Sequence, residues 1–236
     1  RSMHYLLYSE MKVVPEEVSI LITESPRTSR ENREKLTEIL FETFNVKRLH
    51  IANSSMLGLF SYGKTSGLIV DSGFNITSTV PIYEGYPLSH ASIRINIGGE
   101  DLSKNLLSMI QDNLEETYVD IKGRILADDI KEKLGYLLLN QDDGDDVKDV
   151  TYELPDGKKI ELSNELYKAN EILFNPDEEV KKENGLLSLK NMVIDSINKC
   201  DNEIKSDIKE NICLTGGTTL LKNFPEKLKN ELSDSS

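Results

Sequence analysis

The first sixty residues alternate between short apolar runs and polar segments in the order strand, helix, strand, helix. Residues 18–23 form an apolar run suited to a buried strand. Thr28 and Glu31 predict a capping box at the start of a helix. A second strand is predicted at 48–52, and a short helix ends near Gly63. This order favours parallel strands joined by a crossover helix. The first helix places its apolar residues on one face, namely Leu36, Ile39, Leu40 and Phe44.

A different pattern begins at residue 67, where three strands follow one another closely. They are predicted at 67–71, 76–81 and 91–97, with tight turns at Gly73 and at 85–87. Helices follow these strands along the chain. A strand hairpin followed by helices is half of a ribonuclease-H-like unit, so the pattern predicts an α/β fold with mixed sheets flanked by helices.

The rest of the chain is predicted to be mainly helical. Amphipathic helices are expected from about Asp101, at 124–139, at 185–199 and after Pro225. Between them, residues 151–162 read as a hairpin, because Pro155-Asp156-Gly157 supplies turn chemistry. A strand is predicted at 211–215. The acidic segment 140–149 is expected to be a solvated loop, and its spacing does not match a calcium-binding loop.

Composition narrows the function classes. With 236 residues the chain has room for one or two domains. Its net charge of -13 disfavours direct nucleic-acid binding, and two cysteines with three histidines disfavour a disulfide framework or a zinc site. Without a long apolar run or a signal-peptide core, the protein is expected to be soluble and intracellular, with no membrane association. The start at Arg1-Ser2-Met3 suggests either residues added before a natural start or a cut inside a longer chain.

Three groups of residues are candidates for ligand chemistry. Asp71-Ser72-Gly73 follows an apolar strand, where an aspartate can hold a hydrated cation while the next amides and the serine hydroxyl face a phosphate. Gly216-Gly217-Thr218-Thr219 lies between a strand and a helix, and its glycines permit close approach of a ligand. Lys131 and Glu132 lie on a helix, within reach of a ribose or purine. Each group alone can also have a structural role without any ligand. The first would then be a common turn, the second a strand-to-helix connection and the third a solvated ion pair.

The order of these groups, and the sequence around them, resemble actin and the actin-related proteins. The resemblance extends from about His4 to Leu232. It is carried by the segments VVPEEVSILITESPRTSRENREKLTEILFETFN, VDSGFNITSTVPIYEGYPLSHASIRINIGGEDLS, DIKEKLGYL, YELPDGKKIEL and KCDNEIKSDIKENICLTGGTTLLKNFPEKL. It implies an actin-like ATPase fold of two ribonuclease-H-like halves, with ATP and Mg²⁺ or Ca²⁺ between them.

The resemblance also implies roles for residues and a division into parts. Asp71, Ser72 and Gly73 would form the second phosphate hairpin, with Asp71 holding the metal through water. Gly99, Lys131 and Glu132 would lie by the sugar and purine, and Gly216, Gly217, Thr218 and Thr219 would bracket the adenosine. Residues 1–61 would be part of the large N-terminal subdomain, 62–98 with 185–236 a ribonuclease-H-like subdomain, and 99–184 a smaller inserted subdomain.

Departures from the family pattern alter these expectations. The first phosphate loop, the small subdomain inserted after it and a C-terminal part have no counterpart in these residues, so the fold is expected to be incomplete and nucleotide binding weakened. Ser54 stands where actin positions the attacking water with glutamine, and Ser78 stands in place of a histidine. Serine is too short for glutamine's reach, which predicts negligible hydrolysis. The charged stretch 175–183 replaces an apolar loop of the actin filament, which disfavours conventional filaments.

Three functions remain open at this point. The first is an ATP-binding scaffold within a multiprotein complex, whose partners are other actin-family subunits or a helix of the complex. The second is a cytoskeletal, filament-forming protein with slow ATPase activity. The third, a sugar or acetate kinase of the same superfamily, is disfavoured because the matching turns are those of actin. The resemblance implies a cytoplasmic or cytoskeletal location, with the nucleus as the alternative because the C-terminal segment resembles nuclear actin-related proteins of chromatin-remodelling complexes.

Overall fold

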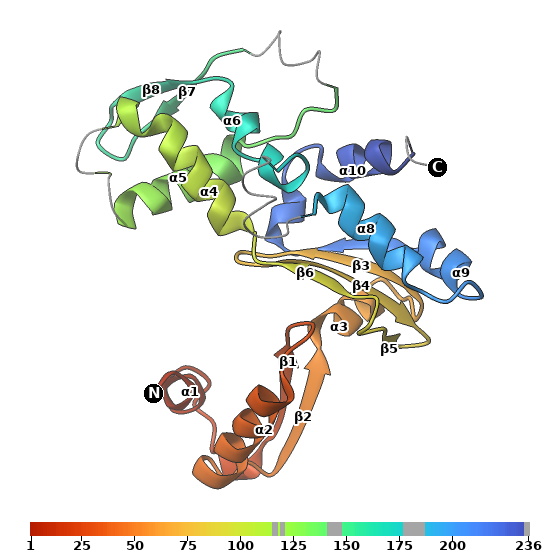
Figure 1. Ribbon diagram of the computed structural model, residues 1–236. Coiled ribbons are helices and arrows are strands. Elements are labelled where there is room, and N and C mark those ends of the chain that lie inside the picture. The colour runs from red at the N-terminus through yellow and green to blue at the C-terminus, as the bar shows by residue number, and fades with distance from the viewer. Residues whose placement is uncertain (115–117, 119–120, 141–147, 177–186, 234–236) are drawn as a thin grey trace.

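The computed structural model describes residues 1–114, 118, 121–140, 148–176 and 187–233. Within these residues the strands form one five-stranded sheet and two two-stranded sheets, flanked by helices (Figure 1). The predicted α/β class is confirmed. No helix in the described ranges has the length and apolar content needed to cross a membrane.

The N-terminal part is a small parallel βαβ unit, as its pattern predicts. Strands β1 (Ser19–Glu24) and β2 (Arg48–Asn53) pair in parallel. The connecting helix α2 (Arg30–Glu38) runs on as η3 (Ile39–Thr43), and α3 (Ser54–Ser61) follows β2. Before β1 lie α1 (Ser2–His4), η1 (Tyr5–Glu10) and η2 (Pro15–Glu17). A local apolar cluster holds the unit together, and its buried members are Leu7, Leu40, Phe44 and Val46.

The cap of α2 differs from the prediction by one residue. The N-cap is Ser29, whose hydroxyl accepts a hydrogen bond from the Asn32 amide at 3.2 Å. The Thr28 hydroxyl instead donates to the Ser25 carbonyl at 2.7 Å, in the turn before the helix. Thr28 and Ser29 can both cap a helix, but the Thr28 hydroxyl is bonded within the turn that begins at Ser25. The cap is therefore Ser29.

The five-stranded sheet positions the candidate site. Its order is β5-β4-β3-β9, with β6 also paired to β4. The strands are β3 (Gly67–Ser72), β4 (Thr77–Tyr83), β5 (Tyr86–Pro87), β6 (Ile93–Ile95) and β9 (Ile212–Thr215). β4 is antiparallel to β3, whereas β9 is parallel to it. β6 is shorter than the predicted 91–97, because only its central residues pair with β4.

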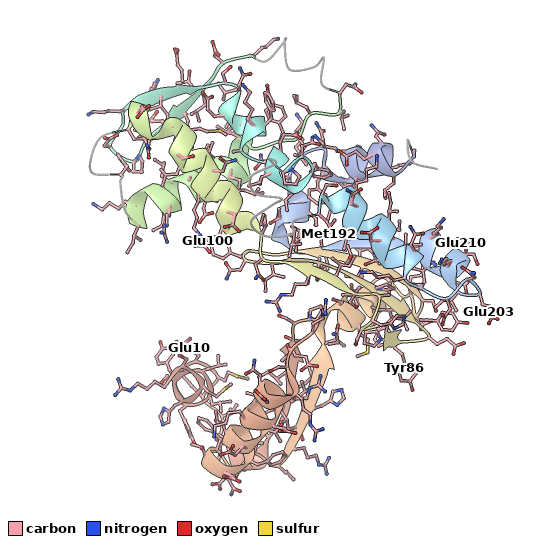
Figure 2. All side chains as sticks on the ribbon, in the orientation of Figure 1. Glu10, Tyr86, Glu100, Met192, Glu203 and Glu210 are labelled. Atoms are coloured by element: carbon pink, nitrogen blue, oxygen red, sulfur yellow. The ribbon has the colours of Figure 1, made fainter. Side chains whose placement is uncertain are left out.

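Helices cover both faces of this sheet. On one face, α3 packs Leu59 against Ile69, Val80 and Ile82. On the other lie α8 (Leu189–Asn198), α9 (Lys205–Glu210) and α10 (Phe224–Ser233), with Met192 fully buried among them (Figures 1 and 2). Part of the predicted helix 185–199 lies outside the described residues. β3 is therefore buried on both sides, as its unbroken apolar run requires.

Residues 99–176 form a second, mainly helical body beside the sheet (Figure 1). Its elements are α4 (Gly99–Ile110), η4 (Gln111–Asn113), α5 (Ile121–Leu134), β7 (Val150–Glu153), β8 (Lys159–Leu162), α6 (Glu165–Lys168) and η7 (Glu171–Leu173). The predicted hairpin is confirmed, with its turn closed from the Gly157 amide to the Leu154 carbonyl. Glu100 marks where α4 leaves the sheet (Figure 2).

The prediction of a helix over 124–139 was wrong at both ends. α5 begins at Ile121 and stops at Leu134. Beyond it, the Tyr136 amide donates to the Leu166 carbonyl and the Leu137 amide donates to the Lys222 carbonyl. These long-range bonds draw the chain out of the helix, although the apolar spacing of Leu134 and Leu137 continues the helical period.

Candidate functional site

The hairpin between β3 and β4 forms the centre of the candidate site. The turn is closed by the Gly73 amide, which donates to the Ile76 carbonyl at 2.9 Å. Asp71 and Ser78 are directly opposite each other in the antiparallel register. The Ser72 hydroxyl is fully buried, lies 2.9 Å from the Thr77 hydroxyl, and so faces the interior in this structure. Any contact of Ser72 with a phosphate would therefore come from its backbone.

Asp71 is a half-buried carboxylate to which the structure gives no ion pair or hydrogen bond from a described side chain. Partial removal from water disfavours the charged form, and burial accordingly raises the pKa of the Asp71 carboxyl above its ordinary value. A carboxylate held at a strand end without a protein cation is suited to a cation brought by a ligand.

The glycine-threonine turn reaches the same place from β9. Because β9 is parallel to β3, the two strands end at the same edge of the sheet. The Thr218 hydroxyl donates to the Gly73 carbonyl at 3.0 Å, and the Thr219 hydroxyl donates to the Gly216 carbonyl at 2.8 Å. Both threonine side chains are buried. Thr218 holds the turn against the hairpin, and Thr219 closes the turn on itself.

The two glycines of this turn have different surroundings. Gly216 has φ +91°, and a methyl group built on it would lie 2.2 Å from the Ser72 carbonyl oxygen. A methyl group on Gly217 would meet nothing within 4 Å. The first glycine is required by the protein's own packing, whereas the second leaves open space beside the pocket.

The start of α4 is the third segment at the site. The Gly99 amide donates to the Gly73 carbonyl at 2.9 Å, so this one oxygen accepts from both Gly99 and Thr218. The Gly98 amide is capped by the Asp101 carboxylate at 3.0 Å. The Lys131 side chain reaches from α5 and donates to the Gly99 carbonyl at 2.8 Å.

These segments border a cavity of about 920 Å³. Six of the ten residues expected to bind nucleotide line it, namely Gly73, Gly99, Lys131, Glu132, Gly217 and Thr218. Asp71, Ser72, Gly216 and Thr219 do not line it but lie in the same turns. The wall is completed by residues that sequence reasoning missed: Phe74, Lys133, Leu134, Gly135, Tyr136, Val150, Leu166, Leu220, Leu221 and Lys222. The tight bend after α5 brings several of them to the cavity, and Gly135 was the one signal of that bend in the sequence.

Two serines of α3 and one of β4 also concern the site, and the one on β4 faces Asp71. Ser54 begins α3 and is half-buried, and Ser78 is buried opposite Asp71. Ser55 was not singled out from the sequence. Its hydroxyl is fully buried and lacks a hydrogen-bond partner among the described residues. Serine side chains are short, so each of these hydroxyls stays close to its own backbone.

Comparison with known sequences identifies the family of the chain. The family model described as Actin matches residues 1–236. Actin-like protein 7A of Macaca fascicularis and of Homo sapiens are each 39% identical to the chain over 233 residues, which cover 97% of this chain and 52% of the relative. The same protein of Mus musculus is 38% identical over the same shares. The chain thus spans about half the length of the curated relatives it matches. A match along the whole chain confirms the expected actin-like fold, and the chain belongs to the actin family.

Proposed function

We propose that this chain is an actin-related protein that binds an adenine nucleotide with Mg²⁺ or Ca²⁺ and acts as a scaffold in a multiprotein complex, with little or no ATP hydrolysis. The observation that carries the nucleotide proposal is the convergence of three chain segments on the Gly73 carbonyl beside a 920 Å³ cavity. Glycine-containing turns and a carboxylate to which no described side chain bonds, together at a strand edge, are suited to phosphate and cation.

The residues fit a nucleotide in the following way. The Asp71-Ser72-Gly73 hairpin would lie against the phosphates, with Asp71 holding the cation through water. Gly99, Lys131 and Glu132 would lie by the sugar and purine, and Gly216, Gly217, Thr218 and Thr219 would bracket the adenosine. The apolar wall at Leu134, Tyr136, Leu166 and Leu221 supports a flat ring on this side of the cavity. When bound, the cation would supply neutralisation of phosphate charge.

Weak hydrolysis is supported by Ser54 and Ser78, which stand where actin has a glutamine and a histidine. Ser54 and Ser78 carry one hydroxyl each on a short side chain, and neither can extend toward a water in the way that a glutamine does. Positioning contributes a large share of phosphoryl-transfer catalysis. A site that binds without turnover stabilises the folded chain by mass action.

The scaffold proposal is supported by exposed apolar side chains. Ile121 and Ile125 lie one turn apart on α5 and are 73% and 64% exposed. Apolar side chains that share a helix face and remain exposed favour protein contact. Actin-family subunits or a helix of a larger complex are the proposed partners, in a cytoplasmic or cytoskeletal location with the nucleus as the alternative. The charged stretch at 175–183, which disfavours filaments, lies largely outside the described residues.

The test is a thermal-shift titration with Mg-ATP on the wild-type chain, Asp71→Asn and the turn variant Asp156→Asn as a charge-matched control. Ligand at one hundred times Kd stabilises a protein by about 2.7 kcal/mol, so the wild type and the control should show a rising Tm. Asp71→Asn should lose the Mg²⁺-dependent part of the shift without losing stability in the absence of ligand, because the lost charge has no described protein partner. A wild type that gains no stability from Mg-ATP would refute nucleotide binding.

Hydrolysis and assembly are measured on the same preparation. Single-turnover phosphate release should stay near the rate without protein, and sedimentation should leave the chain in the supernatant. Rapid phosphate release together with ordinary filaments in the pellet would favour the cytoskeletal alternative over the scaffold.

A further inference from the structure

Lys131 donates all of its hydrogen bonds to the protein itself. Its ammonium lies 2.8 Å from the Gly99 carbonyl, 2.6 Å from the Ser103 hydroxyl and 3.0 Å from the Asp128 carboxylate. An ammonium has three N–H donors, and three acceptors are in place. The residue is 8% exposed. Lys131 therefore lines the cavity without a donor left for a ligand.

Asp128 is the acceptor that also neutralises the charge. It lies one turn before Lys131 on α5, and its side chain is 33% exposed whereas that of Lys131 is 10% exposed. The Ser103 hydroxyl, on α4, donates to the same carboxylate oxygen of Asp128. Asp128 is thus fixed from two helices, and the ion pair spans the contact between α4 and α5.

The Lys131 ammonium lies close to the phosphate hairpin of the proposed function. A methyl group built on Gly99 would be 3.4 Å from Lys131 Nζ and 3.7 Å from the Gly73 carbonyl oxygen. A positive charge at this distance from the hairpin attracts anionic groups there, unless a neighbouring carboxylate cancels its field.

We propose that Asp128 is a positioning residue that holds the Lys131 ammonium on the protein and so lowers the affinity of the cavity for phosphate-bearing nucleotides. The proposal rests on the nucleotide function above. Gly99 and Ser103 anchor the lysine as neutral acceptors, and Asp128 alone among its three acceptors carries charge. The cavity therefore binds phosphate more weakly than it would if the Lys131 charge were not neutralised by Asp128.

Asp128→Asn tests the charge, because the asparagine oxygen still accepts a hydrogen bond. The ATP affinity, measured by calorimetry, should rise about two- to fivefold. This fold-change corresponds to the interaction energy of a partly exposed ion pair. Asp128→Ala removes the acceptor as well and should tighten ATP binding at least as much. Adenosine, which carries no phosphate, should bind the wild type and both variants equally, and the gain for ATP should shrink as salt is raised.

Two controls separate this inference from a change of fold. Asp195→Asn removes one negative charge on α8, which contributes no residue to the cavity wall, and should leave ATP affinity unchanged. Lys131→Met should abolish the gain that Asp128→Asn produces, since the gain acts through the lysine. If the wild type binds ATP, two results would overturn the role of Asp128 while leaving the proposed function intact. One is an equal gain in affinity for ATP and for adenosine in Asp128→Asn, and the other is no gain for ATP in that variant. A wild type that binds neither ligand would overturn the proposed function and this inference together.

Discussion

Gly216 and Gly217 are adjacent and chemically identical, but only one of them is constrained by the fold. Gly216→Ala would place a methyl group 2.2 Å from the Ser72 carbonyl oxygen at a φ of +91°, and we expect it to cost at least about 2 kcal/mol of unfolding free energy. Gly217→Ala meets no atom within 4 Å and should change that free energy by less than about 0.5 kcal/mol.

The alanine variants of Gly216 and Gly217 also distinguish an effect on ligand binding from an effect on stability. Gly217 lines the cavity, so its alanine variant should bind Mg-ATP more weakly while its urea midpoint stays that of the wild type. Urea unfolding and a Mg-ATP titration on each variant give both quantities. A Gly217→Ala protein with unchanged ATP affinity would show that the backbone does not approach the ligand at this turn.

At the scale of elements, one ion pair ties α10 to the body formed by residues 99–176. Lys227 Nζ lies 2.5 and 2.7 Å from the two carboxylate oxygens of Glu171 in η7, and 5.2 Å from the centre of the Phe174 ring. The Lys227 side chain is 9% exposed. Lys227→Met leaves the Glu171 charge poorly hydrated without its partner, and we expect a loss of about 2–4 kcal/mol in the free energy of unfolding.

Urea unfolding of the single and double variants measures this pair. The double variant Lys227→Met with Glu171→Gln should recover part of the loss, because no unpaired charge then remains. The exposed pair between Lys35 and Glu38 on α2 provides the comparison: breaking it should cost less than about 0.5 kcal/mol. Losses of equal size at both pairs would contradict the role of burial.

The hairpin β7–β8 is held to α5 by a titratable contact. The Tyr152 hydroxyl donates to the Asp129 carboxylate, which also accepts from Lys133. Burial, followed by the hydrogen bond to Asp129, raises the pKa of Tyr152 to about 12 from an ordinary 10. A raised folded-state pKa contributes stability that is present below pH 10 and is lost as the pH rises through about 12.

Tyr152→Phe should therefore lose part of the alkaline dependence of stability between these two pH values. Thermal unfolding followed across that range for the wild type and the variant gives the difference. Tyr86→Phe, which alters a tyrosine that is 75% exposed, is the comparison and should keep the alkaline profile of the wild type. An identical alkaline profile for the wild type and Tyr152→Phe would contradict the contact.

For the molecule as a whole, local patterns predicted the elements better than their ends. The parallel βαβ unit, the β3–β4 hairpin and the turn at 155–157 follow from apolar spacing and turn residues. The end of α5 does not, because the bonds that stop it come from Leu166 and Lys222, far along the chain. The cap of α2 also depended on a neighbouring turn. A local sequence pattern does not predict hydrogen-bond partners that lie outside it.

The candidate site shows the same division. Its glycines and Asp71 could be proposed from the sequence because their turns are short and their residue types are distinctive. The cavity wall at Tyr136, Val150 and Leu221 was missed, because these residues carry ordinary apolar side chains and only the fold brings them together. The sequence also could not predict that protein acceptors use all three N–H donors of Lys131, because Ser103 and Lys131 lie on different helices. The three-part division at 1–61, 62–98 with 185–236, and 99–184 stays a proposal.

The Gly73 carbonyl oxygen, which accepts from Gly99 and Thr218, has a mechanical consequence. The start of α4 and the glycine-threonine turn are both hydrogen-bonded to this one oxygen, so neither segment can move away from the hairpin without breaking its bond to it. The oxygen is therefore a fixed junction of three chain segments, and a ligand bound against it would rest on groups that already hold one another in place.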